Sequence, residues 1–592
     1  MRFKIAVPAL VIGVLLMLVG IAQLTFLSPS ETVTASVPAG TESGPVTVID
    51  AGAKEPGADD VDITVRSEGT FTLAVGRASD VDAWVGDAAH LRVTGIEEDG
   101  LQTTFTDGEQ TVPDPSGSDL WTSEETAEGS VTHRWLDPAD GDWSILLASD
   151  GENPAPTNVS ITWPNDETTV WAVPLIVIGA LIVLIGIALF FRKPKRERRP
   201  TVEGSRAHQR ALEARNKQGR KGGAQFSVAV VVMGLTASGL SAAHATTSEP
   251  SPSPATSEPS PSPATSEPSP SPATSEPSPS PATSEPSPSP AAEETGDQPP
   301  VVLESQLERI LASVATVVAE GDAAADADLL APRTAEAALA LRTANYAVRA
   351  DASEIPEPTP VAAEPILTTM ISSDPSWPRT VVALTQSEDN PVPQALVLVQ
   401  ADPRSNYQLS AAIQMLPGTT FPSSEGSAGV AQVPLDNAPG LAYAPQTAMN
   451  AIADFLSEPD GDNADTFEEN SFAEAITSFQ SDVVADPDND SADITFVHAS
   501  EPDYTHALAT GDGGAMVFGY LNHTYSSVPR GSRDSIDLDG TVYESLTGET
   551  STDEGIDVRY GEAVMMYIPT EESGERVRVV GAAQQLLSAE LR

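Results

Sequence analysis

The chain has 592 residues, no cysteine and a formal net charge of −54, with 31 Lys and Arg against 85 Asp and Glu. The lack of cysteine excludes disulfides, zinc–thiolate centres and thiol nucleophiles. Such an excess of acidic residues repels nucleic acid and other anionic polymers, so the composition argues against a nucleic-acid partner.

The basic residues are concentrated at two places. Arg2 and Lys4 precede the first apolar run, and twelve of the 31 basic residues lie in 192–221. Because basic loops stay on the cytoplasmic side of a membrane, we expect both places inside and residues 28–169 and 246–592 outside. This pattern predicts a multi-pass protein of the cell membrane with a cytoplasmic N-terminus and large extracytoplasmic domains. The lipid bilayer is therefore one expected binding partner.

Three apolar segments are candidates for crossing the bilayer. Residues 5–27 carry no charge and are long enough to span a hydrocarbon core of roughly 30 Å, so we expect an anchor over 1–27. A second span is predicted over 170–191, where a basic loop, 192–225, stops it. The third segment, 226–245, is shorter.

That third segment ends in Ala243-His244-Ala245. A basic flank, a short apolar stretch and small residues two apart are the pattern of a signal peptide. The segment is therefore either a third transmembrane helix or an internal signal-like segment with a cleavage site at Ala243 and Ala245.

Residues 28–169 are predicted to form an all-β, sandwich-like domain. Apolar residues alternate with small or polar ones at Phe71, Leu73 and Val75 and again in 143–147 and 159–163. A period of two indicates strands with one buried face.

A spacer is predicted over 246–299, because 247–291 consists of five identical copies of TSEPSPSPA. Three prolines in nine residues exclude a helix or a sheet ladder, and we expect an extended, semi-rigid stalk.

Residues 300–592 are predicted to hold two α+β halves, 300–440 and 441–592. In each half, helical stripes such as Leu307, Ile310 and Leu311 come first and strand patterns follow. The second half adds a predicted capping box, Ser471 to Glu474, at the start of a helix.

This repeated order of helix and antiparallel sheet resembles tandem cystatin-like or nuclear-transport-factor-like modules. The chain as a whole resembles uncharacterised membrane-anchored envelope proteins of actinobacteria. The resemblance implies a location in the cell envelope. The patterns along the chain together predict a multidomain membrane protein with an all-β sandwich ectodomain, a duplicated α+β ectodomain and three transmembrane helices.

Two groups of residues are candidate metal ligands. Asp486, Asp488 and Asp490 alternate as at the start of a calcium loop, but Ser491 and Val497 stand where that loop needs Gly and Glu, which favours a polar loop or a loose cation site. The second group is a set of histidines that could face one another across adjacent strands and bind zinc: His498, His506 and His523.

One motif resembles an enzyme family. Asp537-Leu538-Asp539-Gly540-Thr541 matches the nucleophile motif of haloacid-dehalogenase-type phosphatases. That family also needs a preceding apolar strand and a downstream lysine, and no lysine follows Lys221. We therefore interpret the motif as a turn.

No catalytic residue and no cofactor is predicted. We expect a non-enzymatic cell-envelope protein that displays a binding domain on a proline-rich stalk, towards the cell wall or another envelope protein. Two alternatives stay open. One is an envelope hydrolase or transferase acting on wall polymer or lipid. The other is an assembly partner of a membrane complex, acting through the paired helices 5–27 and 170–191.

Overall fold

The computed structural model describes residues 3–27, 30–55, 61–97, 100–149, 153–165, 171–191, 299–422 and 429–592. These residues form helices and several β-sheets, and residues 1–187 belong to the same compact unit as 292–592. The basic loop 192–225, the segment 226–245 with Ala243 and Ala245, and the repeats 247–291 lie outside the described residues.

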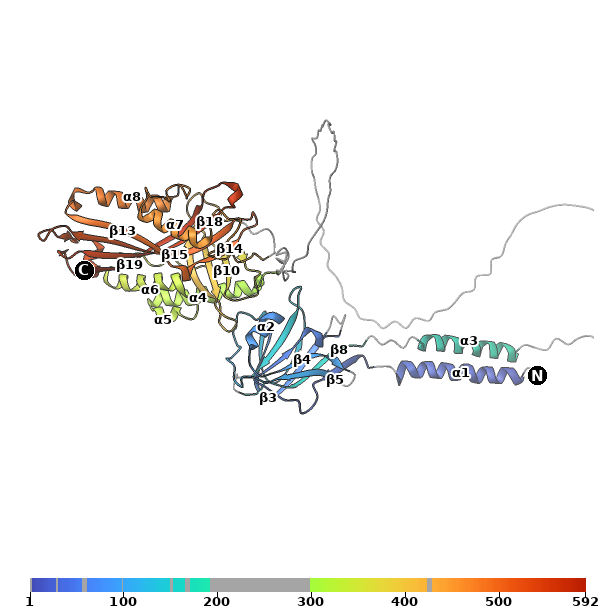
Figure 1. Cartoon of the computed structure of the whole chain (residues 1–592). Coiled ribbons are helices and arrows are strands. Elements are labelled where there is room, and N and C mark those ends of the chain that lie inside the picture. Colours follow the sequence, from blue (N-terminus) through green and yellow to red (C-terminus); the bar gives the residue numbers. More distant parts are fainter. Residues whose placement is uncertain are drawn as a thin grey trace, which may run out of the picture. The chain divides into compact units, whose positions relative to one another are not determined.

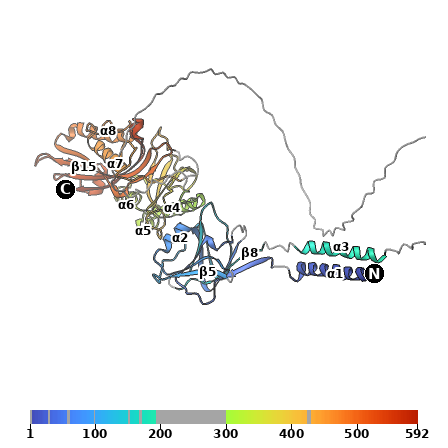
Figure 2. The same cartoon turned by 45° about the vertical axis from the view of Figure 1, so that its right-hand side comes forward.

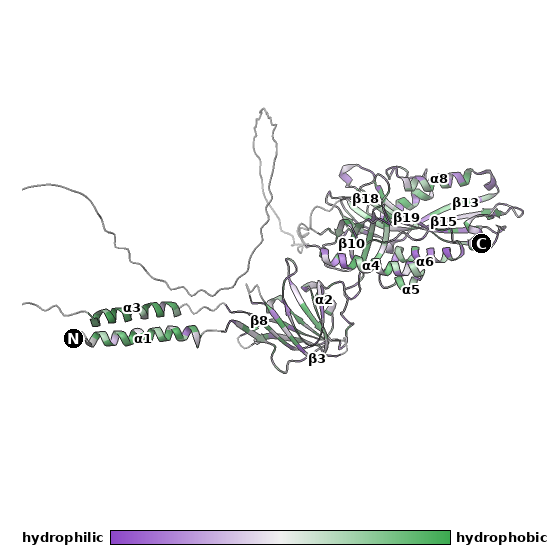
Figure 3. Cartoon of the chain, turned by 180° about the vertical axis from the view of Figure 1, so that it is seen from behind, coloured by the Kyte–Doolittle hydropathy of each residue, from purple (hydrophilic) through white to green (hydrophobic). Residues whose placement is uncertain are grey.

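Two described helices, α1 (Phe3–Thr25) and α3 (Ala172–Phe191), are long and apolar enough to cross a membrane. They lie side by side (Figures 1 and 2), and most of their residues are hydrophobic (Figure 3). The predictions of apolar helices over 5–27 and 170–191 are thus confirmed.

Glycines let α1 and α3 approach closely. A Cβ atom added at Gly13 would lie 2.7 Å from the carbonyl oxygen of Gly179. Gly20 lies against Ala172, and Gly186 lies against the first half of α1, so the helices run antiparallel. Small residues at the contact are typical of helix pairs in lipid, where close packing replaces the hydrophobic effect.

The β region, residues 30–165, lies between α1 and α3 in the sequence. It contains helix α2 (Ala78–Val85) and one sheet in the order β1-β8-β3-β7-β2-β4-β5, with β6 paired to β3. Its strands are β1 (Thr32–Ser36), β2 (Val46–Ile49), β3 (Asp62–Arg77), β4 (His90–Glu97), β5 (Gly100–Thr106), β6 (Ser123–Arg134), β7 (Trp143–Ala148) and β8 (Asn158–Pro164).

The long strand β3 explains why the β region is one continuous sheet where a sandwich of two sheets was expected. Its first half pairs with β8 and its second half with β7, and the register with β6 shifts between Arg66 and Thr70. A strand that bends at a bulge can turn a corner without breaking the sheet. Phe71, Leu73 and Val75 point into the enclosed core, as their alternation predicted.

The C-terminal region, residues 299–592, is mixed α+β. Its helices are α4 (Glu304–Ala324), α5 (Ala327–Leu330), α6 (Glu336–Asp351), α7 (Pro445–Ser457), α8 (Ser471–Ala485) and α9 (Val542–Thr547). A four-stranded sheet contains β9 (Ile366–Ile371), β10 (Arg379–Thr385), β11 (Gln394–Gln400) and β12 (Gln408–Gln414).

The other large sheet of this region has five strands, and a short hairpin stands beside it. The strands of the large sheet are β13 (Ala492–Ser500), β14 (His506–Ala509), β15 (Ala515–Pro529), β18 (Ile556–Ile568) and β19 (Arg578–Leu591). The hairpin pairs β16 (Ile536–Asp537) with β17 (Ser551–Thr552).

Helices cover the five-stranded sheet on both sides. Helices α7 and α8 lie over one face, and α6 lies on the opposite side (Figure 1). On that opposite side, Phe518 and Met565 of the large sheet share a core with Val382 and Val397 of the four-stranded sheet. The expected order of helices followed by an antiparallel sheet is present in 300–440 and in 441–592, but the two parts share this core.

The start of α8 differs from the predicted capping box. Asn470, and not Ser471, is the N-cap, and its side-chain oxygen accepts a hydrogen bond from the backbone N–H of Ala473 at 2.9 Å. Asparagine is among the best N-cap residues, so it takes the role one position earlier than predicted.

Candidate functional site

Two carboxylates of the β region are buried against arginines of the C-terminal region. Asp80 on α2 accepts a hydrogen bond from Arg379 on β10 at 2.7 Å, and these side chains are 3% and 1% exposed. Asp119, in the loop before β6, accepts one from Arg333 at 2.5 Å. With Arg404, described below, we call these residues the charged seam: Asp80, Asp119, Arg333, Arg379 and Arg404.

Asp119 is fully engaged in this seam. Both of its carboxylate oxygens accept from Arg333, and one also accepts from the backbone N–H of Tyr407 at 2.8 Å. Its backbone N–H donates to Asn406, and its carbonyl accepts from Gln306. A buried carboxylate with this many donors is stable only while its partners stay in place.

Arg404 completes the seam at the end of α2. Its guanidinium donates to the carbonyl oxygens of Trp84 and Val85, at 2.9 and 3.0 Å. A cation at the carboxyl end of a helix satisfies free carbonyls and complements the helix dipole. Arg379 packs differently, with its guanidinium carbon 3.7 Å from the centre of the Trp377 ring.

Sequence reasoning missed the charged seam because its partners lie far apart in the chain, 299 residues for Asp80 and Arg379. One signal was available. Residues 299–592 contain twelve arginines and no lysine. Four of these arginines bond to the β region: Arg309, Arg333, Arg379 and Arg404. Arginine suits buried ion pairs better than lysine does, because its donors are fixed in a planar fork.

A second group of buried titratable residues lies beneath α7. His498 on β13 stands directly opposite His523 on β15, and Glu562 on β18 is diagonal to His523. One carboxylate oxygen, Oε1 of Glu562, lies 3.1 Å from Nδ1 of His523 and 3.5 Å from Nε2 of His498. The three side chains are at most 2% exposed. We call them the histidine–glutamate cluster.

Electrostatics favour a charged Glu562 beside an uncharged His498. Burial opposes ionisation of Glu562, but its close interactions with His498 and His523 outweigh it and lower the pKa of the carboxyl to about 2. Burial lowers the pKa of His498, and its interactions with Glu562 offset this only in part. Glu562 is therefore a charged carboxylate in a buried place.

The predicted zinc histidines come together only in part. His498 and His523 stack with ring centres 3.9 Å apart, as the cross-strand hypothesis required. His506 pairs with Phe518 in the sheet, and its side chain bonds instead to Glu336 at 2.8 Å. The third member of the cluster is thus Glu562, which no spacing rule had singled out.

The three predicted calcium-loop carboxylates stay on the surface. Asp486, Asp488 and Asp490 are exposed, and the side chain of Asp486 accepts a hydrogen bond from the backbone N–H of Asp488. Within the described residues, the histidine–glutamate cluster is the group of three whose ligand atoms converge, and these aspartates are not in it. A cation site in this loop stays a prediction.

The phosphatase-like motif forms a turn, as we interpreted it. Asp537 ends the two-residue strand β16, and its side chain accepts a hydrogen bond from the N–H of Asp539. Gly540 has a φ of 71°, a left-handed conformation typical of turns, and α9 follows.

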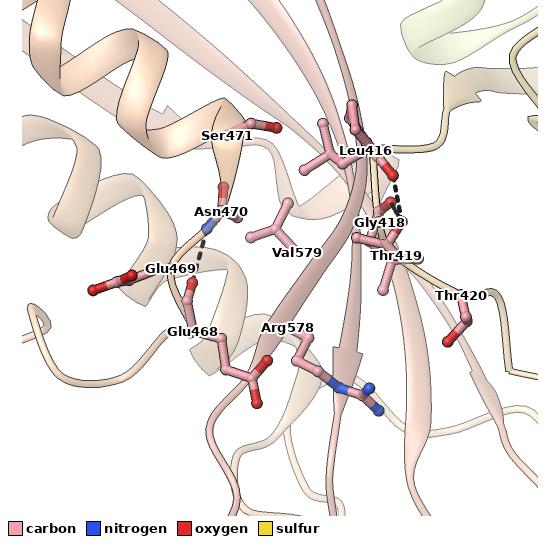
Figure 4. A pocket seen from close by; sticks show the side chains of 12 residues that line it. Leu416, Gly418, Thr419, Thr420, Glu468, Glu469, Asn470, Ser471, Arg578 and Val579 are labelled. Carbon is pink, nitrogen blue, oxygen red and sulfur yellow. Dashed lines mark hydrogen bonds between the residues drawn. The ribbon is translucent and has the colours of Figure 1, made fainter.

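An open polar cleft lies at the start of α8 (Figure 4). It has a volume of about 290 Å³ and lies between Asn470 and Ser471 on one side and residues 416–420 on the other. Arg578 lines it together with Glu468 and Glu469, so charges of both signs face the opening. The mixed charge gives this cleft no clear preference for anions or cations.

The comparisons with known proteins add one finding. Residues 298–590 match a family model described as a domain of unknown function, DUF8094. The match covers the C-terminal region and does not include the β region or the two apolar helices. No curated protein and no solved structure matches the chain.

Proposed function

We propose that the chain is a non-enzymatic, membrane-anchored envelope protein whose β region holds the C-terminal region at the membrane surface. The observation that carries this proposal is the charged seam, above all Asp119, which is 4% exposed and bonded to Arg333 and Tyr407. Buried, specifically paired charges fix the register between two surfaces, because a shifted partner would leave a charge buried and unpaired.

The seam also supports the three-crossing topology. The β region lies between α1 and α3 in the sequence, and these helices are antiparallel, so residues 30–165 belong on one side of a membrane that both helices cross. The C-terminal region bonds to the β region and therefore belongs on the same side. Since α3 ends on the opposite side, the chain must cross again before residue 299.

The apolar segment available for that crossing is 226–245. With the basic residues of 192–221 in the cytoplasm, both the β region and the C-terminal region come to lie outside the cell. The repeats 247–291 then form the covalent connection between the third crossing and the docked C-terminal region. The cell wall or another envelope protein would then bind the C-terminal region while that region is docked on the β region.

A hydrolase or transferase has less support. Such an enzyme needs titratable side chains that a substrate can reach. Within the described residues, the group of three His and Glu side chains whose ligand atoms converge is buried.

The test is release of the C-terminal region after its tether is cut. A protease recognition site is placed in 247–291 of the full chain, membranes are prepared and cut, and the fragment carrying 299–592 is followed in pellet and supernatant. We expect the wild-type fragment to stay with the membranes. Asp119→Ala leaves Arg333 buried without its partner, a change that costs about 3–5 kcal/mol, so this fragment is expected in the supernatant.

The matched control is Asp140→Ala, which removes an exposed carboxylate from the same region and should leave the fragment bound. Immediate release of the wild-type fragment at physiological salt would contradict the proposal. Retention of both variants would mean that other contacts, and not the charged seam, hold the region.

A further inference from the structure

The histidine–glutamate cluster leaves buried polar atoms without partners. Neither ring nitrogen of His498 has a hydrogen-bond partner, and Nε2 of His523 and Oε2 of Glu562 also lack one. His498 and His523 are 95% or more buried. An unsatisfied buried polar group costs about 1–3 kcal/mol. Nε2 of His498 is both unpaired and only 3.5 Å from Oε1 of Glu562, so an ion bound between these atoms and His523 would satisfy it.

The geometry is that of a metal site. A zinc ion bound at 2.0–2.2 Å in a tetrahedron holds its ligand atoms roughly 3.3 Å apart. The distances from Oε1 of Glu562 to Nδ1 of His523 and to Nε2 of His498 are 3.1 and 3.5 Å. One ligand atom from each of the three residues lies within 4.8 Å of the others.

The surroundings hold the proposed ligands in position. Gln584 on β19 donates a hydrogen bond at 2.9 Å to the same oxygen of Glu562, and the ring of Tyr560 stacks on His523 with centres 5.2 Å apart. The backbone N–H of His498 donates to the hydroxyl of Ser457 at the end of α7. Such contacts around a site orient metal ligands and tune their basicity.

We propose that His498, His523 and Glu562 bind a divalent transition metal ion, zinc in the first instance, as a structural centre of the C-terminal region. Two imidazole nitrogens and one carboxylate oxygen form a ligand set that suits zinc and disfavours calcium and magnesium, which take oxygen ligands. The ion would neutralise the buried carboxylate and join the strands β13, β15 and β18. This proposal is independent of the docking function.

The experiment measures zinc in the full chain purified in detergent from cells grown with zinc. We expect about one equivalent per chain, and a melting temperature that falls when the ion is stripped and recovers when zinc alone is returned. His523→Asn and Glu562→Gln should each lose the ion. His506→Gln, which changes a histidine on the same sheet outside the cluster, should keep it.

Two results would overturn the proposal. One is a folded wild-type chain that holds no zinc and melts at the same temperature with and without it. The other is full zinc binding by both cluster variants, which would point to ligands elsewhere, such as the loop of Asp486, Asp488 and Asp490. Both variants keep nearly the original shape, and the wild-type measurement stands even where a variant fails to fold.

Discussion

The protein buries carboxylates in two places, and the two places are satisfied differently. At the charged seam, both oxygens of Asp119 accept hydrogen bonds from Arg333, and one also accepts from Tyr407. In the histidine–glutamate cluster, Oε1 of Glu562 has close neighbours while Oε2 has none. The carboxylate of Asp119 is thus fully paired within the chain, whereas that of Glu562 is not.

The difference separates two uses of buried charge. Buried ion pairs seldom add net stability over apolar packing, but a wrong pairing leaves a buried charge without its partner and is strongly destabilising. The charged seam uses this property to fix how the C-terminal region meets the β region. In the cluster the pairing is less complete, and under our proposal the unpaired Nε2 of His498 is a metal ligand.

A third carboxylate, Glu336 at the start of α6, is expected to contribute stability that depends on pH. Burial raises its pKa, but hydrogen bonds with His506 and Ser410 outweigh this and hold the pKa below its ordinary value of 4.5. A lowered folded-state pKa gives stability that is present above the unfolded-state pKa and is lost as the pH falls through the folded-state value.

We therefore expect Glu336→Gln to lower the free energy of unfolding by roughly 1–2 kcal/mol at pH 7, since it weakens hydrogen bonds to a charged group. The deficit should shrink as the pH falls below about 4.5, where the wild-type carboxylate becomes protonated. Chemical unfolding of both chains at several pH values measures this. A deficit that stays constant down to pH 3 would contradict the assignment.

The smallest effect is expected where the cluster is made apolar. In the zinc-free protein, the triple change His498→Leu, His523→Leu and Glu562→Met should alter the free energy of unfolding by less than about 1 kcal/mol, or raise it, because apolar packing often replaces buried charge without loss. Thermal or chemical unfolding measures this against the stripped wild type.

The corresponding apolar exchange at the charged seam, Asp119→Leu with Arg333→Met, should have a larger effect than the exchange in the cluster. It removes acceptors that Tyr407 also uses, so we expect the tether-cutting assay to show release. A large loss of stability in the cluster variant would mean that the cluster is a structural ion pair in its own right.

Local patterns predicted most of the elements. The period-two alternation at Phe71, Leu73 and Val75 lies in β3, and the uncharged runs 5–27 and 170–191 contain α1 and α3. A sandwich was expected because the alternation of apolar and polar residues shows which face of a strand is buried. It does not show where a strand bends. The bend in β3 depends on a shift in its register with β6, and such a shift produces no periodic pattern in the sequence.

The sites were harder to foresee than the elements. His498 and His523 were singled out because strand patterns surround both, and their register in the sheet brings them together. Glu562 lies 39 residues from His523, and Arg379 lies 299 residues from Asp80, so neither partner has a local signature. Such pairings depend on strand order and on the meeting of two surfaces.

Docking of the C-terminal region on the β region can be tested in intact cells by a photo-cross-link. A cavity of about 370 Å³ at the charged seam is lined by Ser123 and Glu124 from the β region and by Ser313 on α4, so a benzophenone side chain at position 313 has room there. The same side chain at Asp482, an exposed position on α8, is the control.

We expect irradiation to link position 313 to a peptide containing residues 117–124, within a chain that keeps the gel mobility of a monomer. Position 482 should give no such link. An intact chain in which position 313 yields no more of that peptide than position 482 does would contradict the docking.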